Sequence, residues 1–145
     1  MPSSARQAER TARRRLRRGL AYAWVAPVTL VGLVLALVAL LGGARAHWVE
    51  AQLEVAGAHR LRAVGRWPHI RHFGAITLGH VILGRDDATL RRWRRHEQVH
   101  VRQYERWGLL FWPLYLAASG WCWLRGRDAY LDNPFEIEAR QTDGS

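Results

Sequence analysis

The stretch ATLRRWRRHEQVHVRQYERW, residues 88–107, decides how the rest of this sequence is interpreted. Its apolar and aromatic side chains recur at spacings of three and four residues, which is the period of an amphipathic helix. Asp86 and Asp87 precede it as candidate N-cap residues, and Gly108 follows it as a natural stop. The stretch therefore predicts a helix from about Ala88 to Trp107. One face of this helix is formed by Leu90, Trp93, Glu97, His100, Tyr104 and Trp107.

The candidate metal-binding and catalytic residues of this helix are in the segment His96-Glu97-Gln98-Val99-His100. Residues four apart lie on one face of a helix, so both imidazoles could reach one metal ion about 2.0–2.1 Å away. Glu97 is adjacent and could accept a proton from a water molecule that the metal activates. The alternative is a solvated basic helix that merely contains two histidines. We expect Zn²⁺ as the cofactor and a third protein ligand, because two histidines alone make a weak site.

Two segments upstream of the helix have the residue pattern of strands. Apolar residues alternate with polar ones from Val49 to Val55, which predicts a half-exposed strand that is closed by Gly57. Residues 75–83, AITLGHVIL, are rich in β-branched side chains and predict a second strand. Within it, Gly79 marks a bulge or a close approach of another segment.

The downstream part predicts two more helices. The apolar run Leu109–Leu124 is too short for a full membrane crossing. A crossing would also place the histidine pair and the carboxyl-terminal glutamates on opposite sides of the bilayer, where they could not share one metal. We therefore expect this run to be a buried or interfacial helix. Asn133-Pro134 then starts a short helix, with Asn as the cap and Pro in the first position.

The amino-terminal part has the character of a membrane anchor. Residues 1–20 are basic and poor in apolar side chains, so little fixed structure is expected there. Residues 21–41 carry no charge and are long enough to span the hydrocarbon core. We divide the chain into a basic cytoplasmic tail (1–20), a transmembrane anchor (21–42) and a metal-binding domain (43–145). The excess of arginines before the anchor predicts a single-pass protein of the bacterial cytoplasmic membrane with its amino terminus inside and its domain outside.

A secretory signal peptide is the competing interpretation of the same segment. Ala44-Arg45-Ala46 could serve as a cleavage site of the small-x-small type. The apolar core is longer than that of most signal peptides, and this length favours an uncleaved anchor.

Composition narrows the possible partners. All 22 basic residues are arginine, none is lysine, and the formal net charge is +10. Seven of these arginines crowd the first eighteen residues directly before the apolar run, which favours an anionic membrane surface over nucleic acid as the partner. The single cysteine, Cys122, excludes an intrachain disulfide and a thiolate zinc cluster.

Two motifs together carry a family resemblance. HExxH followed some distance later by a helix with Glu-x-x-Ala resembles the glutamate-zincin peptidases, which include integral-membrane endopeptidases. The pair HExxHxxQY and NPFExEA is still more similar to small bacterial membrane-anchored proteins. These motifs cover residues 75–107 and 130–140, whereas the first 70 residues match only in being apolar and anchored.

The resemblance implies that His96, His100 and Glu136 are the metal ligands and Glu97 the general base. Glu138 is the alternative third ligand, because two residues apart on a helix only one of the two carboxylates can face the metal. Glu136 also fits a capping box with Asn133, which is a purely structural role. The membrane endopeptidases have Asp at the position of Arg140, so the support of a histidine ligand must differ here.

Three further residues are secondary candidates for a role in the site. Gln103 could orient a ligand, although such a glutamine more often makes a simple polar contact. Tyr104 and Tyr130 could stabilise an oxyanion, with packing as the alternative role, and Tyr130 is taken as the catalytic candidate.

These observations lead to one expectation for fold and function. We expect an α+β fold: a transmembrane helix, then a small zincin-like domain with a short antiparallel sheet, an active-site helix and carboxyl-terminal helices. We expect a zinc-dependent metallopeptidase that acts on a peptide or protein substrate and binds membrane lipid but no nucleic acid. The alternative is a non-catalytic, membrane-anchored zinc-binding or scaffold protein. The sequence specifies neither the substrate nor an oligomeric state.

Overall fold

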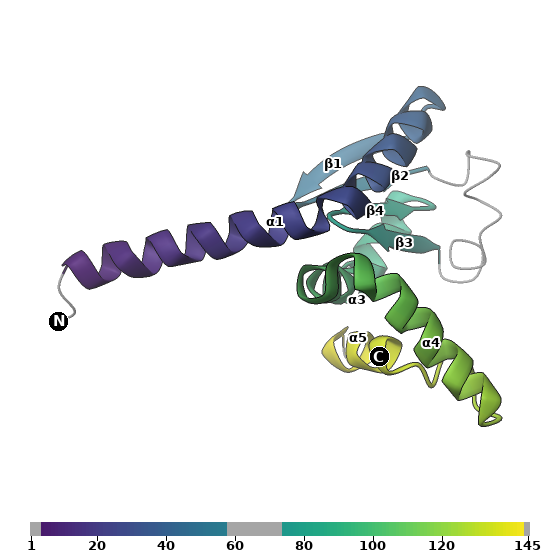
Figure 1. The fold of residues 1–145 in the computed structure, drawn as a ribbon. Coiled ribbons are helices and arrows are strands. Elements are labelled where there is room, and N and C mark those ends of the chain that lie inside the picture. The colour runs from purple at the N-terminus through teal and green to yellow at the C-terminus, as the bar shows by residue number, and fades with distance from the viewer. Residues whose placement is uncertain (1–3, 58–73, 144–145) are drawn as a thin grey trace.

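The computed structural model describes residues 4–57 and 74–143, which form an α+β fold (Figure 1). The α+β class predicted from the sequence is confirmed. In chain order the elements are α1 (Ser4–Leu41), β1 (Arg45–Val49), β2 (Gln52–Ala56), β3 (Ala75–Leu78), β4 (Val81–Gly84), α3 (Asp87–Trp107), η2 (Gly108–Leu110), α4 (Phe111–Leu124) and α5 (Pro134–Asp143).

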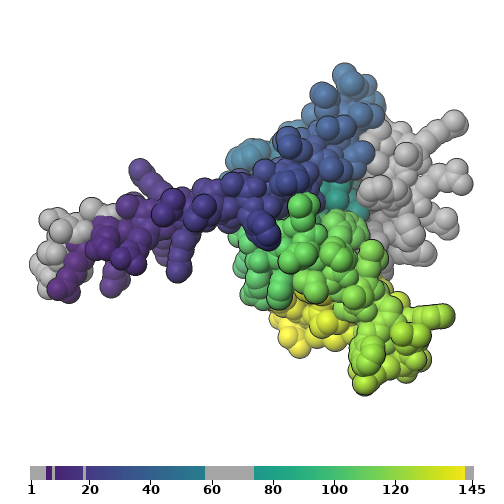
Figure 2. Space-filling model, in the orientation of Figure 1, coloured from purple at the N-terminus to yellow at the C-terminus, as the bar shows by residue number. Residues whose placement is uncertain are grey.

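Helix α1 has two parts with different surroundings. Its amino-terminal part projects from the body of the molecule, whereas the later part lies against the rest (Figures 1 and 2). Pro27 lies inside α1, and the ribbon changes direction along its length, as expected where proline removes a helical hydrogen bond. The helix begins at Ser4, so the expectation of little fixed structure in residues 1–20 was wrong for residues 4–20; residues 1–3 lie outside the described residues. Arginine has a high helix propensity, and the basic segment continues the apolar helix without a break.

One face of the apolar part of α1 is part of the protein core. Val25, Val28, Ala36 and Ala39 are buried, and they join β-strand and α4 side chains in the main hydrophobic cluster. Gly32 lies on the same face, where a Cβ atom would stand 2.8 Å from the Cβ of Val81. The small side chains on this face therefore allow α1 to approach the sheet closely.

The sheet consists of two hairpins rather than two single strands. Its order is β1-β2-β4-β3, with antiparallel pairs within each hairpin and a parallel pair between β2 and β4. The sheet is therefore mixed, whereas an entirely antiparallel sheet was expected. The segment predicted as one strand around Glu50 turns there instead, and Glu50 has a positive φ of 54°.

The second predicted strand, residues 75–83, also turns in its middle. Gly79 lies in the turn between β3 and β4 and has a φ of 63°, a conformation that favours glycine. A Cβ atom at Gly79 would be 2.3 Å from Thr29 Oγ1 of α1. The close approach expected at this glycine is thus confirmed, although the strand does not continue through it.

Of the polar face predicted for residues 49–55, Glu50 is exposed but Gln52 and Glu54 are buried. Glu54 is only 2% exposed, and its carboxylate accepts hydrogen bonds from Arg94 Nε at 2.7 Å and Nη2 at 2.8 Å. The two-pronged pairing with Arg94 compensates the buried charge and attaches α3 to the sheet.

The helices downstream of the sheet follow the sequence prediction closely. Asp86 caps α3 by accepting a hydrogen bond from the Thr89 backbone N–H at 2.7 Å, and Gly108 ends the helix. Asn133 caps α5 by accepting from the Phe135 backbone N–H at 3.0 Å. Helix α5 lies beside α3 (Figure 1). This places the end of the chain next to the His96–His100 face.

Within the described residues, one helix is long and apolar enough to cross a membrane, and it lies in Glu9–Leu41. Its length and composition are those that a membrane anchor or a signal sequence would have. Helix α4 contains 14 residues, about 21 Å at the usual rise, and is too short to span the hydrocarbon core.

Candidate metal centre

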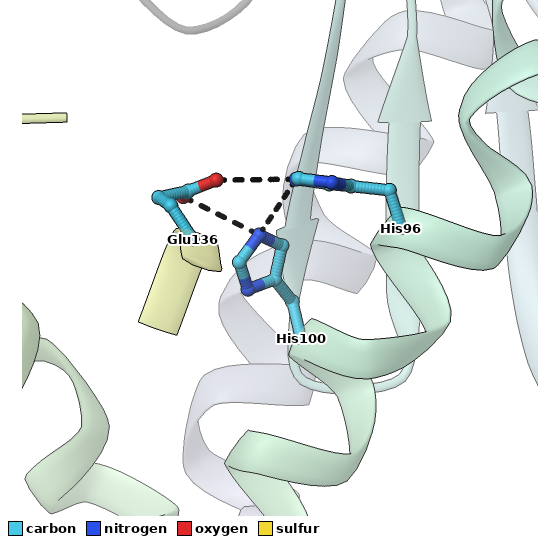
Figure 3. Close-up of side chains that lie close together, drawn as sticks. All are labelled: His96, His100 and Glu136. Atoms are coloured by element: carbon cyan, nitrogen blue, oxygen red, sulfur yellow. Dashed lines mark hydrogen bonds and ion pairs between the residues drawn. The ribbon is translucent and has the colours of Figure 1, made fainter. Parts of the chain in front are cut away.

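Helix α3 presents the two histidines of the HExxH string on its buried side. His96 is 4% exposed and His100 is 8% exposed. Their Nε2 atoms lie 3.2 Å apart, because residues four apart stand one above the other on a helix. Two buried imidazole nitrogens thus point at the same small volume (Figure 3).

Helix α5 brings a carboxylate to this volume. Glu136 is 1% exposed; its Oε2 lies 3.2 Å from His96 Nε2 and its Oε1 lies 3.4 Å from His100 Nε2 (Figure 3). The alternative role of Glu136 in a capping box is not adopted. The Asn133 backbone N–H donates to the carbonyl of Tyr130 instead of to the Glu136 side chain.

The spacing of these three groups fits a single metal ion. A tetrahedral ion with ligands about 2.0–2.1 Å away holds its ligand atoms roughly 3.3–3.4 Å from one another. His96 Nε2 and His100 Nε2 lie 3.2 Å apart and each is close to a different oxygen of Glu136, and one ligand atom from each residue can be chosen so that all three lie within 4.8 Å of one another. Two imidazoles and a carboxylate are also a donor set that zinc accepts. The buried residues His96, His100 and Glu136 could therefore hold a metal ion.

The same three groups have strong electrostatic effects on one another. Burial alone would lower the pKa of His100, but the hydrogen bond and charge of Glu136 outweigh it and raise the pKa to about 9. Burial would raise the pKa of Glu136, but the hydrogen bonds with His100 and His96 hold that pKa far below its ordinary value. In the metal-free protein, Glu136 is thus an anion that attracts either protons or a cation to the histidines.

Glu97 lines the same cavity as the triad but is not one of its three members. Its side chain is 5% exposed, and its Oε2 accepts a hydrogen bond from Thr77 Oγ1 at 2.6 Å. Thr77 belongs to β3, so the sheet holds the carboxylate in position. Sequence reasoning did not single out Thr77. Its position in the strand nearest to α3 would have indicated this role. That position becomes apparent only once the hairpin of β3 and β4 is known.

Tyrosines surround the carboxylate of Glu136. Tyr130, predicted as a catalytic residue, is half-buried and lines the cavity. Burial and the nearby Glu136 raise its pKa, so its hydroxyl stays protonated and able to donate. Tyr115 of α4 was not predicted; its hydroxyl donates to Glu136 Oε1 at 2.8 Å. Tyr104 is fully buried against Phe111 at a ring distance of 4.3 Å.

Glu138, the alternative ligand, is directed to other partners. Its Oε2 accepts a hydrogen bond from Gln103 Nε2 at 2.9 Å, and its Oε1 lies 3.7 Å from Arg106. Arg140, at the position where the resemblance led us to expect Asp, donates to the backbone carbonyl of Leu131. Neither residue is in the described group that could hold a metal.

The other described histidines lie outside the group. His47 pairs with Asp87 at 3.4 Å, and His80 stacks on Tyr22 and contacts Glu105 at 3.2 Å. His59, His69 and His72 lie outside the described residues.

Comparison with known proteins found no matching family, no matching curated protein and no matching solved structure.

Proposed function

We propose that this chain is a zinc-dependent metallopeptidase that is held at a membrane by α1. The observation that carries the proposal is the convergence of His96, His100 and Glu136, whose candidate ligand atoms lie within 4.8 Å of one another, with Glu97 in the same cavity. Three protein ligands leave one coordination position for water or substrate, whereas structural zinc sites usually have four. The arrangement therefore favours catalysis over a purely structural site.

Zinc bound here would polarise a substrate carbonyl and make water acidic enough to deprotonate near neutral pH. Glu97 would act as the general base that accepts a proton from water and as the acid that returns it to the leaving amine. The hydrogen bond that the Thr77 hydroxyl donates to Glu97 Oε2 limits the rotation of the Glu97 carboxylate. This keeps the carboxylate in place beside the cavity for proton transfer. Tyr130 lines the cavity as a neutral donor and is suited to stabilise the negative charge that develops on the substrate oxygen.

The membrane part of the proposal rests on the second face of α1. Outside the buried stripe, its side chains are large, apolar and exposed, and they include Leu30, Val31, Val34, Leu37 and Leu41. Contact with lipid hydrocarbon removes these side chains from water. The arginines that precede the segment support an amino terminus on the cytoplasmic side of a bacterial cytoplasmic membrane.

The packing of α1 favours an anchor over a removable signal. Cleavage after Ala46 would remove Val25, Val28, Ala36 and Ala39 from the main hydrophobic cluster. Intact mass and amino-terminal sequencing of the membrane fraction test this directly. A chain that begins near His47 would contradict the anchor.

The test of the enzyme begins with full-length protein in detergent. Elemental analysis should find one zinc per chain, and a pool of quenched fluorescent peptides should be hydrolysed. Glu97→Gln should keep the zinc and lose hydrolysis. Glu105→Gln is the matched control, because Glu105 lies on the same helix but outside the cavity, and it should keep both. Zinc binding without hydrolysis, equal in the original protein and both variants, would instead support the non-catalytic zinc protein.

A further inference from the structure

Gln103 makes three hydrogen bonds from one buried amide. It is 1% exposed and lies one turn after His100 on α3. Its Oε1 is 2.8 Å from His100 Nδ1, while its Nε2 is 3.0 Å from the Phe135 carbonyl and 2.9 Å from Glu138 Oε2. The amide therefore joins a proposed metal ligand to the first turn of α5.

The partners of this amide fix its orientation. The Phe135 carbonyl and the Glu138 carboxylate only accept hydrogen bonds, so the NH₂ group of Gln103 must face them. Its oxygen then faces His100 and, being an acceptor, requires a hydrogen on Nδ1. When His100 loses its other proton, the lone pair is left on Nε2, the atom directed at Glu136.

The same amide also holds the segment that carries the third ligand. Phe135 and Glu138 flank Glu136 on α5, and both accept from Gln103. Arg106, on the next turn of α3, lies 3.7 Å from the other oxygen of Glu138. A shift of Gln103 would therefore disturb the ring orientation of His100 and the distance between α3 and α5 together.

We infer that Gln103 is the positioning residue of the metal centre and that Glu138 is its structural counterpart. Gln103 sets the tautomer in which His100 binds metal through Nε2, and it holds Glu136 at bonding distance from both histidines. This inference rests on the proposed zinc site but not on peptidase activity. It assigns Glu138 a supporting role in place of the ligand role that the sequence left open.

The test compares the zinc affinity of full-length variants, measured by chelator competition in detergent. Gln103→Glu keeps an oxygen for His100 but sets a carboxylate against Glu138, and we expect affinity to fall about 10- to 100-fold. The double variant Gln103→Glu/Glu138→Gln restores a donor–acceptor pair with the roles exchanged but leaves the Phe135 carbonyl without its donor, so it should recover part of that loss. Glu138→Gln alone keeps an acceptor for Gln103 and should stay close to the original affinity.

A second readout reports the tautomer directly. In zinc-loaded protein with ¹⁵N-labelled histidine, proton–nitrogen correlation spectra should show hydrogen on Nδ1 of His100 and none on Nε2. An original-like affinity in folded Gln103→Glu protein, or hydrogen on Nε2 in the zinc-loaded protein, would overturn the inference and leave the peptidase proposal standing. Conversely, retained hydrolysis in Glu97→Gln would contradict the peptidase mechanism and leave the zinc-affinity test of Gln103 intact.

Discussion

Protons and zinc compete for His100, and this competition gives the site a measurable pH dependence. In the metal-free protein, burial works against the charge of His100, but Glu136 outweighs burial and raises the pKa to about 9. At pH 7 only about 1% of His100 would then be neutral, and zinc binds only the neutral imidazole. We expect the apparent zinc association constant to rise about tenfold per pH unit up to that pKa and to level off above it.

The unfolding free energy of the metal-free protein should fall as pH rises, whereas the zinc affinity should increase. The pKa of His100 is 6.5 in its ordinary state and about 9 in the fold, so it is raised by folding. The His100–Glu136 pair thus stabilises the fold fully below about pH 6.5, and this contribution disappears as pH rises through about 9. The shift corresponds to about 3 kcal/mol of unfolding free energy. Saturating zinc replaces the proton, so the zinc-loaded protein should not show this loss.

The assay is a chelator competition between about pH 6 and pH 10, corrected for protonation of the chelator. Calorimetry in buffers of different ionisation enthalpy should show about one proton released from His100 per zinc near pH 7. Glu136→Gln should change the curve in two ways. The plateau should fall because a ligand is lost, and the affinity should level off at lower pH because the charge that holds the proton on His100 is gone. A zinc affinity that is flat over the whole range would refute the reasoning.

Three further predictions concern residues around the site. Thr77→Val removes the hydrogen bond to Glu97, so kcat should fall by about tenfold. The zinc content, measured by elemental analysis, should stay the same. Reduced zinc content would show that Thr77 acts on the metal instead. Arg94→Met leaves the carboxylate of Glu54 buried and unpaired, and denaturant unfolding should show a loss of about 3 kcal/mol. An unchanged midpoint would mean that water reaches this carboxylate. Gly32→Val forces a side chain against β4, and thermal unfolding should show a loss of about 1–3 kcal/mol; unchanged stability would show that α1 does not pack on the sheet.

The elements that the sequence predicted well are those that depend on local rules. Helix α3 and its ends follow from an apolar repeat, the Asp86 cap and the Gly108 stop, all within one segment. The same is true of α5, where Asn133-Pro134 is a self-contained starting signal. The metal-site candidates followed from a motif in each of these two helices, and the fold brings them together.

The strands were harder because their pattern continues through the turns. The alternation around Glu50 has the period of a single strand, yet the chain reverses there with a positive φ at a non-glycine residue. The β-branched run from Ala75 likewise shows no polar loop at its turn, because Gly79 and His80 are buried beneath α1. Tertiary packing therefore removed the usual polar signature of both hairpin turns.

The supporting residues of the site were harder still. Tyr115 is embedded in an apolar run and meets Glu136 only because the chain returns after α4. The polarity of Glu54 suggested exposure, and its partner Arg94 lies on another element. Such long-range pairs leave no local signal in one sequence, so the sequence could name the ligand candidates but not the residues that hold them.

The two faces of α1 explain how a membrane segment can also be part of this domain. The sheet-facing side carries Val, Gly and Ala, which permit close contact, and the opposite side carries Leu and Val, which remain exposed. Lipid tails are as apolar as these side chains, so tight packing against small residues, rather than exclusion of water, must hold α1 to the sheet. Val25 and Val28 join Tyr104, Phe111 and Tyr115 in one cluster, and Tyr115 in turn bonds to Glu136. The proposed membrane segment and the segment that carries the third candidate ligand are therefore linked by a single packed core.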